Sequence, residues 1–317
     1  MPAKLPGADV KLMARLGTTT RMQLYEADLA SGLKVELASG SADKATVSAA
    51  QSFAFDLVRP GPTVFVEQTK RVISWAALRA ERAPEILSQL GPQFEYWSSV
   101  AGLGPVMTPY TRELVAAAMG FASHVVQRLK YLLPVPRAME FSARVQPMIE
   151  APAFFAYPSG HATQAFMVAR LLALLLGAGG GQRQEQDMQL YRQAERIATN
   201  RVVAGVHYPI DSAAGCALGL WLADYVAARC GGSVAGGGER RTFDPTANGW
   251  AIPAAADFEP VVTQRSPGSP TKVSPYDHRG EYDAVGAVFP AALAPDAMPI
   301  AWLWQQAARE WHANGYA

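Results

Sequence analysis

Apolar residues recur at the three- and four-residue spacing of an α-helix through most of the middle of the chain. The clearest run starts at Thr108-Pro109, a favoured N-cap residue followed by a favoured first helical residue, and Pro134 stops it. Pro84 and Pro209 are expected in the first turns of later helices. The pattern predicts an all-α bundle, with further helices over 64–83, 84–91, 159–177, 185–203, 209–231 and 300–314.

The two ends of the chain lack this regular pattern. Residues 34–37 and 52–58 alternate loosely between apolar and polar side chains and predict short strands. Residues 231–297 are rich in Gly, Pro, Ser and Asp, which predicts a long irregular segment that wraps the core. We therefore expect an irregular or β N-terminal segment over 1–62, a helical core over 63–232, and an irregular C-terminal extension over 233–317 that ends in a helix.

Composition narrows the class of protein. Half of the 317 residues are apolar and 17% are charged, as in a globular protein with a sizeable core. The net charge of +1 argues against nucleic acid as the main partner, because duplex-binding proteins carry a large basic excess.

Two apolar segments deserve comparison with membrane spans. Residues 162–177 are interrupted by Arg170, and residues 213–230 by Asp224, so we expect buried core helices and no transmembrane span. The first residues contain no apolar stretch of signal-peptide length, from which we expect a cytoplasmic protein.

The cysteines and tryptophans add two structural expectations. Cys216 and Cys230 fall on one expected helix, about four turns apart, too far to bridge, and are interpreted as reduced core thiols. A disulfide in an exported protein is the alternative. The last helix carries Trp302, Trp304 and Trp311, which would dock it on the body or form a homodimer interface.

The candidate chemistry begins with Pro158-Ser159-Gly160-His161, just before an apolar helical run. Backbone N–H groups at a helix start are unpaired and carry partial positive charge, so they suit an oxyanion. Gly160 would let the backbone approach closely, and the Ser159 hydroxyl adds a donor. An ordinary helix entry would account for the tetrapeptide equally well.

A second motif places Arg201 six residues before His207 and Asp211 four residues after it. A carboxylate in the first turn of a helix can accept a hydrogen bond from Nδ1 of the imidazole, which leaves Nε2 free as a nucleophile or a ligand. The structural alternative is an Asp–His cap with an unrelated surface arginine. Another histidine, His124, falls inside the long helix that begins at Pro109 and is interpreted as a satisfied core residue.

The third motif, Lys130 followed by Arg137, is weak by itself, since a solvated basic face would explain it. It gains weight because it precedes the other two and ends at a proline-flanked loop. Two guanidinium groups and one ammonium group can neutralise a multiply charged oxyanion from several sides. The three motifs together predict a site for a tetrahedral oxyanion and for covalent or acid–base chemistry on it.

These residues resemble the superfamily that contains the type 2 phosphatidic acid phosphatases, the bacterial class A acid phosphatases and the vanadium-dependent haloperoxidases. Its pattern is Lys-x6-Arg-Pro, Pro-Ser-Gly-His and Ser-Arg-x5-His-x3-Asp. Ala138 replaces the first proline and Asn200 the serine, and the matches span residues 130–211. The resemblance implies a helical bundle of the vanadium haloperoxidase and acid phosphatase type.

The resemblance also implies a role for each matched residue. His207 would accept the phosphoryl group or ligate vanadium, His161 would act as general acid and base, and Asp211 would orient His207. The oxygens of phosphate or vanadate would be bound by Lys130, Arg137, Ser159, Gly160 and Arg201.

Within the superfamily, we expect a vanadate-dependent haloperoxidase that oxidises halide with hydrogen peroxide. The segment from Phe154 to Thr163 resembles vanadium chloroperoxidase, Phe154 is a candidate for the halide pocket, and Gly205-Val206-His207 also resembles that branch. The short chain, Gln127 and Ala138 point away from it.

The alternative is a metal-independent phosphatase that hydrolyses small phosphoesters through a phosphohistidine at His207. A protein of another class, a non-catalytic oxyanion-binding scaffold, is disfavoured because no polar residue of the set is missing.

Overall fold

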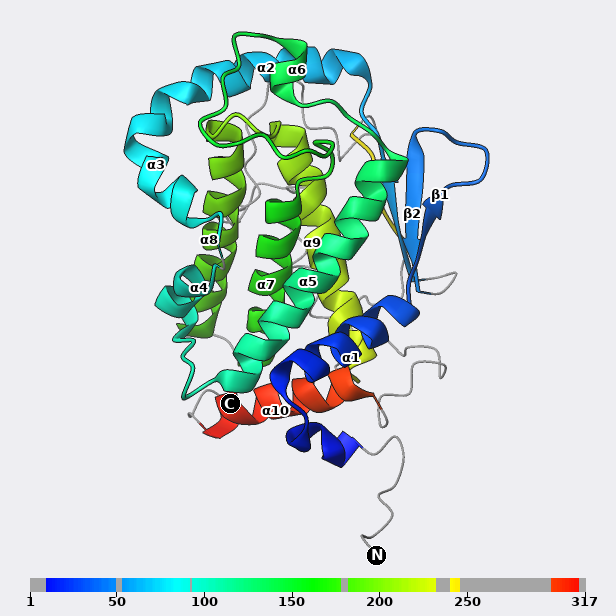
Figure 1. The fold of residues 1–317 in the computed structure, drawn as a ribbon, viewed down its shortest axis with the longest axis vertical. Coiled ribbons are helices and arrows are strands. Elements are labelled where there is room, and N and C mark those ends of the chain that lie inside the picture. The colour runs from blue at the N-terminus through cyan, green and yellow to red at the C-terminus, as the bar shows by residue number, and fades with distance from the viewer. Residues whose placement is uncertain are drawn as a thin grey trace, which may run out of the picture.

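The computed structural model describes residues 10–49, 53–91, 93–177, 182–231, 240–245 and 298–313. Four long helices form its centre: α5 (Pro109–Leu132), α7 (Gly160–Leu176), α8 (Gln182–Val203) and α9 (Pro209–Arg229). They run side by side, and α7 packs against the other three (Figure 1). The expected all-α bundle is confirmed, and its central helices begin and end within a few residues of their expected bounds.

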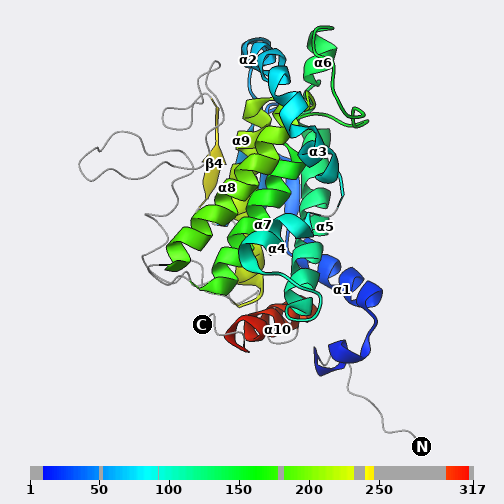
Figure 2. The same ribbon diagram turned by 90° about the vertical axis from the view of Figure 1, so that its left-hand side faces the viewer.

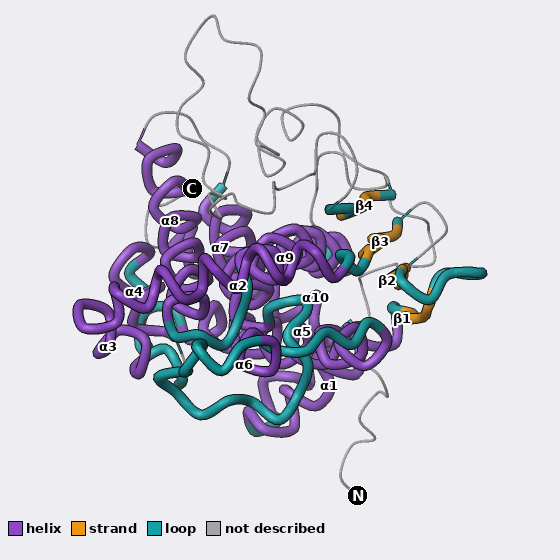
Figure 3. Tube along the Cα trace, turned by 90° about the horizontal axis from the view of Figure 1, so that it is seen from above, coloured by secondary structure: helices purple, strands orange, loops and turns teal. Residues whose placement is uncertain are grey.

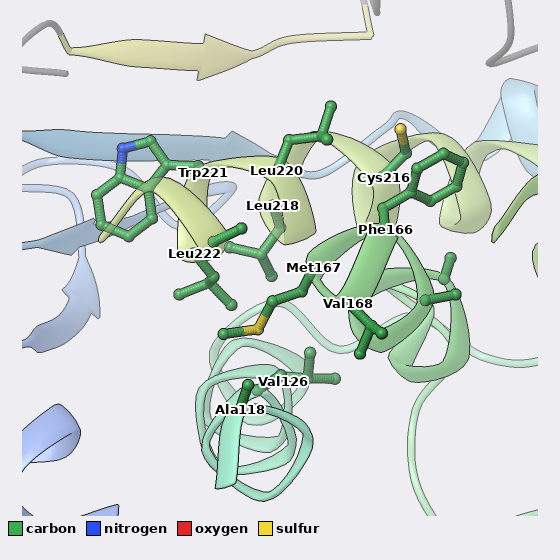
Figure 4. Close-up of a cluster of buried hydrophobic side chains, with 14 of the residues drawn as sticks. Ala118, Val126, Phe166, Met167, Val168, Cys216, Leu218, Leu220, Trp221 and Leu222 are labelled. Atoms are coloured by element: carbon green, nitrogen blue, oxygen red, sulfur yellow. The ribbon is translucent and has the colours of Figure 1, made fainter. Parts of the chain in front are cut away.

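The contact between α7 and α9 is the tightest in the bundle. A Cβ atom on Gly215 would lie 2.6 Å from the carbonyl oxygen of Ser159, and one on Gly219 would lie 3.0 Å from the amide nitrogen of Met167. The two glycines therefore let the helix backbones approach more closely than any side chain would allow. Figure 4 shows the apolar packing nearby, where side chains of α7 and α9 meet Ala118 and Val126 of α5.

Helices α2 (Pro62–Trp75), α3 (Arg79–Ser88) and α6 (Ala138–Phe141) cover one end of the bundle, and α4 (Phe94–Ala101) packs on α8 (Figures 1 and 3). The break expected at Pro84 lies earlier, at the 3₁₀ turn Ala76–Leu78, and Pro84 is inside α3. Arg79 holds this bend through bonds to the carbonyls of Val203 and Gln146, contacts that a local pattern cannot reveal.

Four strands form a sheet beside the helices, in the order β1 (Lys34–Leu37), β2 (Lys44–Ser48), β3 (Ala54–Val58) and β4 (Arg241–Phe243) (Figure 3). The first three are antiparallel neighbours, and β4 pairs parallel to β3.

The first and third strands match the two expected strands, whereas β4 falls in the segment expected to be irregular. Asp56 of β3 holds β4 in place, because its carboxylate accepts two bonds of 2.7 Å from Arg240. Residues 232–239 and 246–297, the rest of the expected irregular segment, lie outside the described residues. The division into three segments stays a prediction.

The far end of the bundle is closed by both ends of the described chain. The 3₁₀ helix η1 (Val10–Arg15), α1 (Thr18–Ser31) and α10 (Pro299–Ala313) lie there together (Figures 1 and 2). Glu310 caps α5, since its carboxylate accepts bonds from the amides of Tyr110 and Thr111 at 2.7 and 2.8 Å. Trp311 is buried, so α10 docks on the body, while a homodimer stays a prediction.

Three further expectations can be compared with this fold. Cys216 and Cys230 are both buried and free, as expected of core thiols. Within the described ranges, no helix has the length and apolar character needed to cross a membrane. His124, interpreted as a core residue because it falls inside a long helix, is instead exposed on α5.

Candidate active site

The three motifs meet at the end of the bundle that α2, α3 and α6 cover (Figures 1 and 3). Helices α5 and α8 run antiparallel to α7 and α9, which are parallel to each other, so α5 and α8 end where α7 and α9 begin. Lys130 and Arg201 lie in the last turns of α5 and α8. The remaining positions are Arg137 as N-cap of α6, Ser159 as N-cap of α7, Gly160 and His161 in its first turn, His207 just before α9, and Asp211 in the first turn of α9.

A backbone hydrogen bond ties the second motif to the third. The amide of Ser159 donates to the carbonyl oxygen of Asp211 at 2.9 Å. The Ser159 hydroxyl accepts from the amide of Ala162 at 3.4 Å, which makes it the expected N-cap. A Cβ atom on Gly160 would meet only Val126, at 3.8 Å, so the first turn of α7 remains open to close approach.

The histidine–carboxylate pair has the predicted geometry. Nδ1 of His207 lies 2.9 Å from Oδ2 of Asp211, and the same oxygen accepts from the amide of Tyr208 at 2.9 Å. Because a carboxylate only accepts, the proton belongs on Nδ1 and the lone pair on Nε2. Burial, and then Lys130 and Arg137, hold the pKa of His207 well below its usual value, so the imidazole is neutral.

Each of the three cations of the motifs is almost completely buried. Lys130 donates to the carbonyls of Phe155 and Ala156 at 2.5 and 2.8 Å. Arg137 donates to the carbonyl of Phe154 at 3.0 Å and to that of Val206. These bonds aim the side chains without neutralising them, since carbonyl oxygens carry no net charge.

The cations keep unused donors. Among the described residues, Nη2 of Arg137 and both Nε and Nη1 of Arg201 are buried without a hydrogen-bond partner. Burial lowers the pKa of Lys130 to about 7 and that of Arg201 to about 10. Buried donors are almost always satisfied in proteins, so this concentration of uncompensated positive charge fits an oxyanion.

His161 faces the same charge. Its Nε2 lies 3.2 Å from the carbonyl oxygen of Gln89, which places the proton on Nε2. Burial, then Arg201, Lys130 and Arg137, lower the pKa of His161 to about 3. A phosphoryl dianion beside these cations would offset their effect and raise that pKa, which suits a residue that exchanges protons during the reaction.

A hydrogen bond at the start of α6 holds the loop that carries Arg137. Ala138, which stands where the superfamily has proline, is buried as the first residue of α6. The amide of Arg137 donates to the carboxylate of Glu140 at 2.5 Å. This bond is one half of a capping box, and the guanidinium of Arg137 carries no acceptor that could supply the other half.

Comparisons with known proteins agree with the motifs. No protein-family model matches the chain. The solved structure of the first transmembrane PAP2 type phosphatidylglycerolphosphate phosphatase from Bacillus subtilis is 18% identical, covers 67% of this chain and 87% of its own, and has a TM-score of 0.32, too low to establish a shared fold.

A curated relative is closer in sequence. The chain is 31% identical over 156 residues to decaprenylphosphoryl-5-phosphoribose phosphatase of Mycobacterium tuberculosis, in two strains, which covers 49% of this chain and 80% of the relative. The chain belongs to the type 2 phosphatidic acid phosphatase (PAP2) superfamily. The relative is a phosphatase, so the comparisons support the phosphatase alternative, and nothing in them supports the haloperoxidase that we first expected.

The donor set of this PAP2 member would fit vanadate as well as phosphate, because both are tetrahedral oxyanions. His207 would hold either group, and the same cations would face its oxygens. In the described part of the chain, no cluster of three or more His, Cys, Asp or Glu residues could hold a metal ion.

Phe154, the candidate for a halide pocket, lies at the edge of this PAP2 site. Its ring centroid is 5.1 Å from Nζ of Lys130 and 5.2 Å from Cζ of Arg137, while 44% of the residue stays exposed. Phe155 beside it is 43% exposed. The ring of Phe154 gives the site an apolar edge next to the cations, and a halide role for Phe154 stays a prediction.

None of the sequence motifs indicated the group of residues that supports Arg201. Gln89, at the C-cap of α3, accepts bonds at its side-chain oxygen from Arg201 and from Asn200. Gln89 is 112 residues from Arg201, so only the folded chain brings them together. Asn200, which replaces the serine of the superfamily, is buried within this group.

Proposed function

We propose that this PAP2 member is a phosphatase that hydrolyses phosphomonoesters through a phosphohistidine on His207. One observation carries the proposal. The Nε2 atom of His207, freed by the bond from Nδ1 to Asp211, lies in a buried site where Lys130, Arg137 and Arg201 provide unneutralised positive charge.

In the first step, Nε2 of His207 attacks phosphorus while the bond to the leaving oxygen breaks opposite to it. The cations and the N–H groups at the start of α7 stabilise the charge on the phosphoryl oxygens. His161, protonated in the presence of the dianion, transfers its proton to the leaving alcohol. Asp211 stabilises the positive charge that His207 acquires.

In the second step, neutral His161 removes a proton from water, and the resulting hydroxide attacks phosphorus. The P–N bond breaks, phosphate leaves and His207 returns to its neutral form. Once phosphate has left, the pKa of His161 is low again and it releases this proton; it is protonated anew when the next dianion binds. The three cations supply the charge stabilisation that other phosphatases obtain from metal ions, so we expect turnover in the presence of EDTA.

The proposed substrate class is a phosphomonoester that is held mainly by its phosphoryl group. The relative is named for decaprenylphosphoryl-5-phosphoribose, a phosphorylated sugar on a polyprenyl carrier. The exposed rings of Phe154 and Phe155 offer an apolar surface beside the phosphoryl site. A phosphosugar with a prenyl chain is therefore the first natural substrate to compare with the free phosphosugar.

The test is hydrolysis of a chromogenic phosphomonoester with EDTA, with and without orthovanadate, beside a halogenation assay with bromide and peroxide. We expect that vanadate inhibits hydrolysis and that His207→Ala is inactive. Rapid quenching without acid should trap a phosphorylated histidine. His124→Ala, an exposed histidine on α5, is the matched control and should retain full activity. Full activity in His207→Ala would refute the proposal, and halogenation that appears only with vanadate would restore the haloperoxidase.

A further inference from the structure

Gln89 contacts two residues of the site from a helix that none of the motifs includes. It is completely buried at the C-cap of α3. Its side-chain oxygen accepts from Nη2 of Arg201 at 3.0 Å, and its backbone carbonyl faces Nε2 of His161 at 3.2 Å. One residue therefore supports both an oxyanion-binding cation and the general acid–base.

The amide of Gln89 has one possible orientation. Its oxygen accepts from Arg201 and from Nδ2 of Asn200 at 3.1 Å, and its NH₂ group donates to Oε1 of Glu85 at 3.1 Å. A flipped amide would set the NH₂ group against two donors and its oxygen against a carboxylate, so every contact would be repulsive. Glu85 is itself fixed by Arg196, which donates to both of its oxygens at 2.9 and 3.0 Å.

The orientation of Arg201 follows from these contacts. Its Nη2 is occupied by Gln89 and by the carbonyl of Ile86 at 3.0 Å, whereas Nε and Nη1 have no partner among the described residues. The guanidinium is planar, so fixing one edge directs the other. The two partnered contacts thus leave the remaining donors for an anion.

A neutral amide suits this task better than a carboxylate. Glu85, the nearest carboxylate of this group, pairs with Arg196 and contacts Arg201 only through Gln89. A carboxylate in direct contact with Arg201 would neutralise the charge that a phosphoryl group needs. Gln89 therefore fixes the orientation of Arg201, and its neutral amide separates Arg201 from the carboxylate of Glu85.

We propose that Gln89 is a positioning residue that directs Arg201 toward the phosphoryl oxygens. The inference rests on the proposed function, since it assigns Arg201 to anion binding. It extends the site to α3, whose C-terminal end becomes part of the machinery that selects an oxyanion.

The test uses binding of inorganic phosphate, measured by calorimetry on the full chain, together with kcat and KM. Gln89→Met keeps the shape of the side chain and removes its oxygen. We expect phosphate to bind about 10- to 100-fold more weakly, because a hydrogen bond to a charged group is lost. In an Arg201→Met background, adding Gln89→Met should change the affinity by less than about twofold, because the two residues act through one contact.

Gln93→Met is the matched control. Gln93 is a buried glutamine at the N-cap of α4, and its side-chain oxygen has no partner in the described part of the chain. It should leave phosphate affinity within about twofold of the wild type. If Gln89→Met fails to fold, Glu85→Gln replaces it, because without that carboxylate the amide of Gln89 is free to flip. Glu85→Gln should bind phosphate more weakly than the wild type, and it should cause no further loss of affinity in the Arg201→Met background.

An unchanged phosphate affinity in folded Gln89→Met, or losses that multiply in the double variant, would overturn the role of Gln89. Failure of the proposed function gives a different result. A wild-type chain that binds phosphate, loses affinity in Gln89→Met and hydrolyses no phosphomonoester would leave Gln89 as a positioning residue of a binding site.

Discussion

The amide of Ser159 donates to the carbonyl oxygen of Asp211 at 2.9 Å, which joins the start of α7 to the first turn of α9. The N–H groups offered to an oxyanion and the carboxylate that orients His207 are therefore held at a fixed separation. Gly215 of α9 packs against the same turn, because a Cβ atom there would lie only 2.6 Å from the carbonyl oxygen of Ser159. The precision of the site thus depends on how closely the two helices pack.

Because the two helices pack so closely, we expect alanine at position 219 of α9 to lower the free energy of unfolding. Alanine normally stabilises a helix by about 1 kcal/mol relative to glycine. In Gly219→Ala the new methyl group would collide with the backbone of Thr163 and Met167, which cannot move aside. We expect the free energy of unfolding to fall by about 1–3 kcal/mol, measured by urea denaturation.

Gly120→Ala in the middle of α5 is the matched control for that substitution. Its methyl group would meet only the carboxylate of Glu26, at 2.5 Å, the flexible end of a side chain. This variant should be as stable as the wild type or slightly more so. Equal stabilities for both variants would show that the α7–α9 contact is looser than described.

The charge on His207 during turnover gives the second prediction. Asp211→Asn keeps an oxygen for the two bonds that Oδ2 accepts, but it cannot stabilise the positive imidazolium formed on phosphorylation. We expect kcat to fall about 10²-fold or more with KM little changed. Steady-state kinetics with a chromogenic phosphomonoester measures both.

Asp224→Asn is the control that separates a loss of kcat from a loss of stability. Asp224 is an equally buried aspartate on α9, paired with Arg170 and Arg241 far along the helix from the site. The substitution should lower stability and leave kcat within about threefold. Equal losses of kcat in the two variants would contradict a specific role for Asp211.

The third prediction concerns pH and Lys130. Burial lowers the pKa of Lys130 to about 7, so the ammonium is charged below that pH and is lost as pH rises through it. Burial also raises the pKa of Asp211 to about 7, and its ionisation over the same range adds negative charge. We expect the inhibition constant of sulfate, a dianion throughout, to rise by up to about tenfold per pH unit above pH 7.

Lys130→Met removes the titrating ammonium and keeps the length of the side chain. At pH 6 it should bind sulfate more weakly than the wild type does, and its affinity should vary less with pH. A wild-type affinity that stays constant from pH 6 to pH 9, or a variant that binds sulfate as tightly as the wild type, would remove Lys130 from the site.

The fourth prediction tests how the C-terminal helix supports α5. The carboxylate of Glu310 accepts three hydrogen bonds, from the amides of Tyr110 and Thr111 and from the Thr111 hydroxyl at 2.7 Å. Glu310→Ala should lower the free energy of unfolding by about 1–2 kcal/mol, in the range of a lost N-cap. Gln305→Ala, exposed on the same helix, should change it by less than about 0.5 kcal/mol. A similar loss in both would mean that the cap is not formed in solution.

The sequence placed the three motifs at helix ends because each motif is local. Ser159 is the N-cap of α7 and Asp211 lies in the first turn of α9, so spacing alone places their polar groups there. Gln89 is different, since its role depends on α3 packing against α8, and nothing near it in the chain indicates that contact.

The elements that the sequence missed have little apolar pattern to detect. Only Tyr25 and Leu29 are buried in α1, so its face toward the core is narrow. Strand β4 has three residues, and the whole helical core separates it in the sequence from its partner β3, so no local pattern indicates the pairing. The segment around Phe154 resembled the chloroperoxidases over ten residues, and that short resemblance favoured a branch that the longer similarity to a phosphatase does not support.

The placement of α1 and α10 has a practical consequence. Both ends of the described chain leave the bundle on the face opposite to the candidate site (Figure 1). A linker attached at either end would therefore orient an immobilised molecule with its catalytic mouth toward the solution. Activity on a solid support should then depend little on which end is anchored, whereas attachment through the loop of Phe154 and Phe155 would bring the support against the substrate entrance.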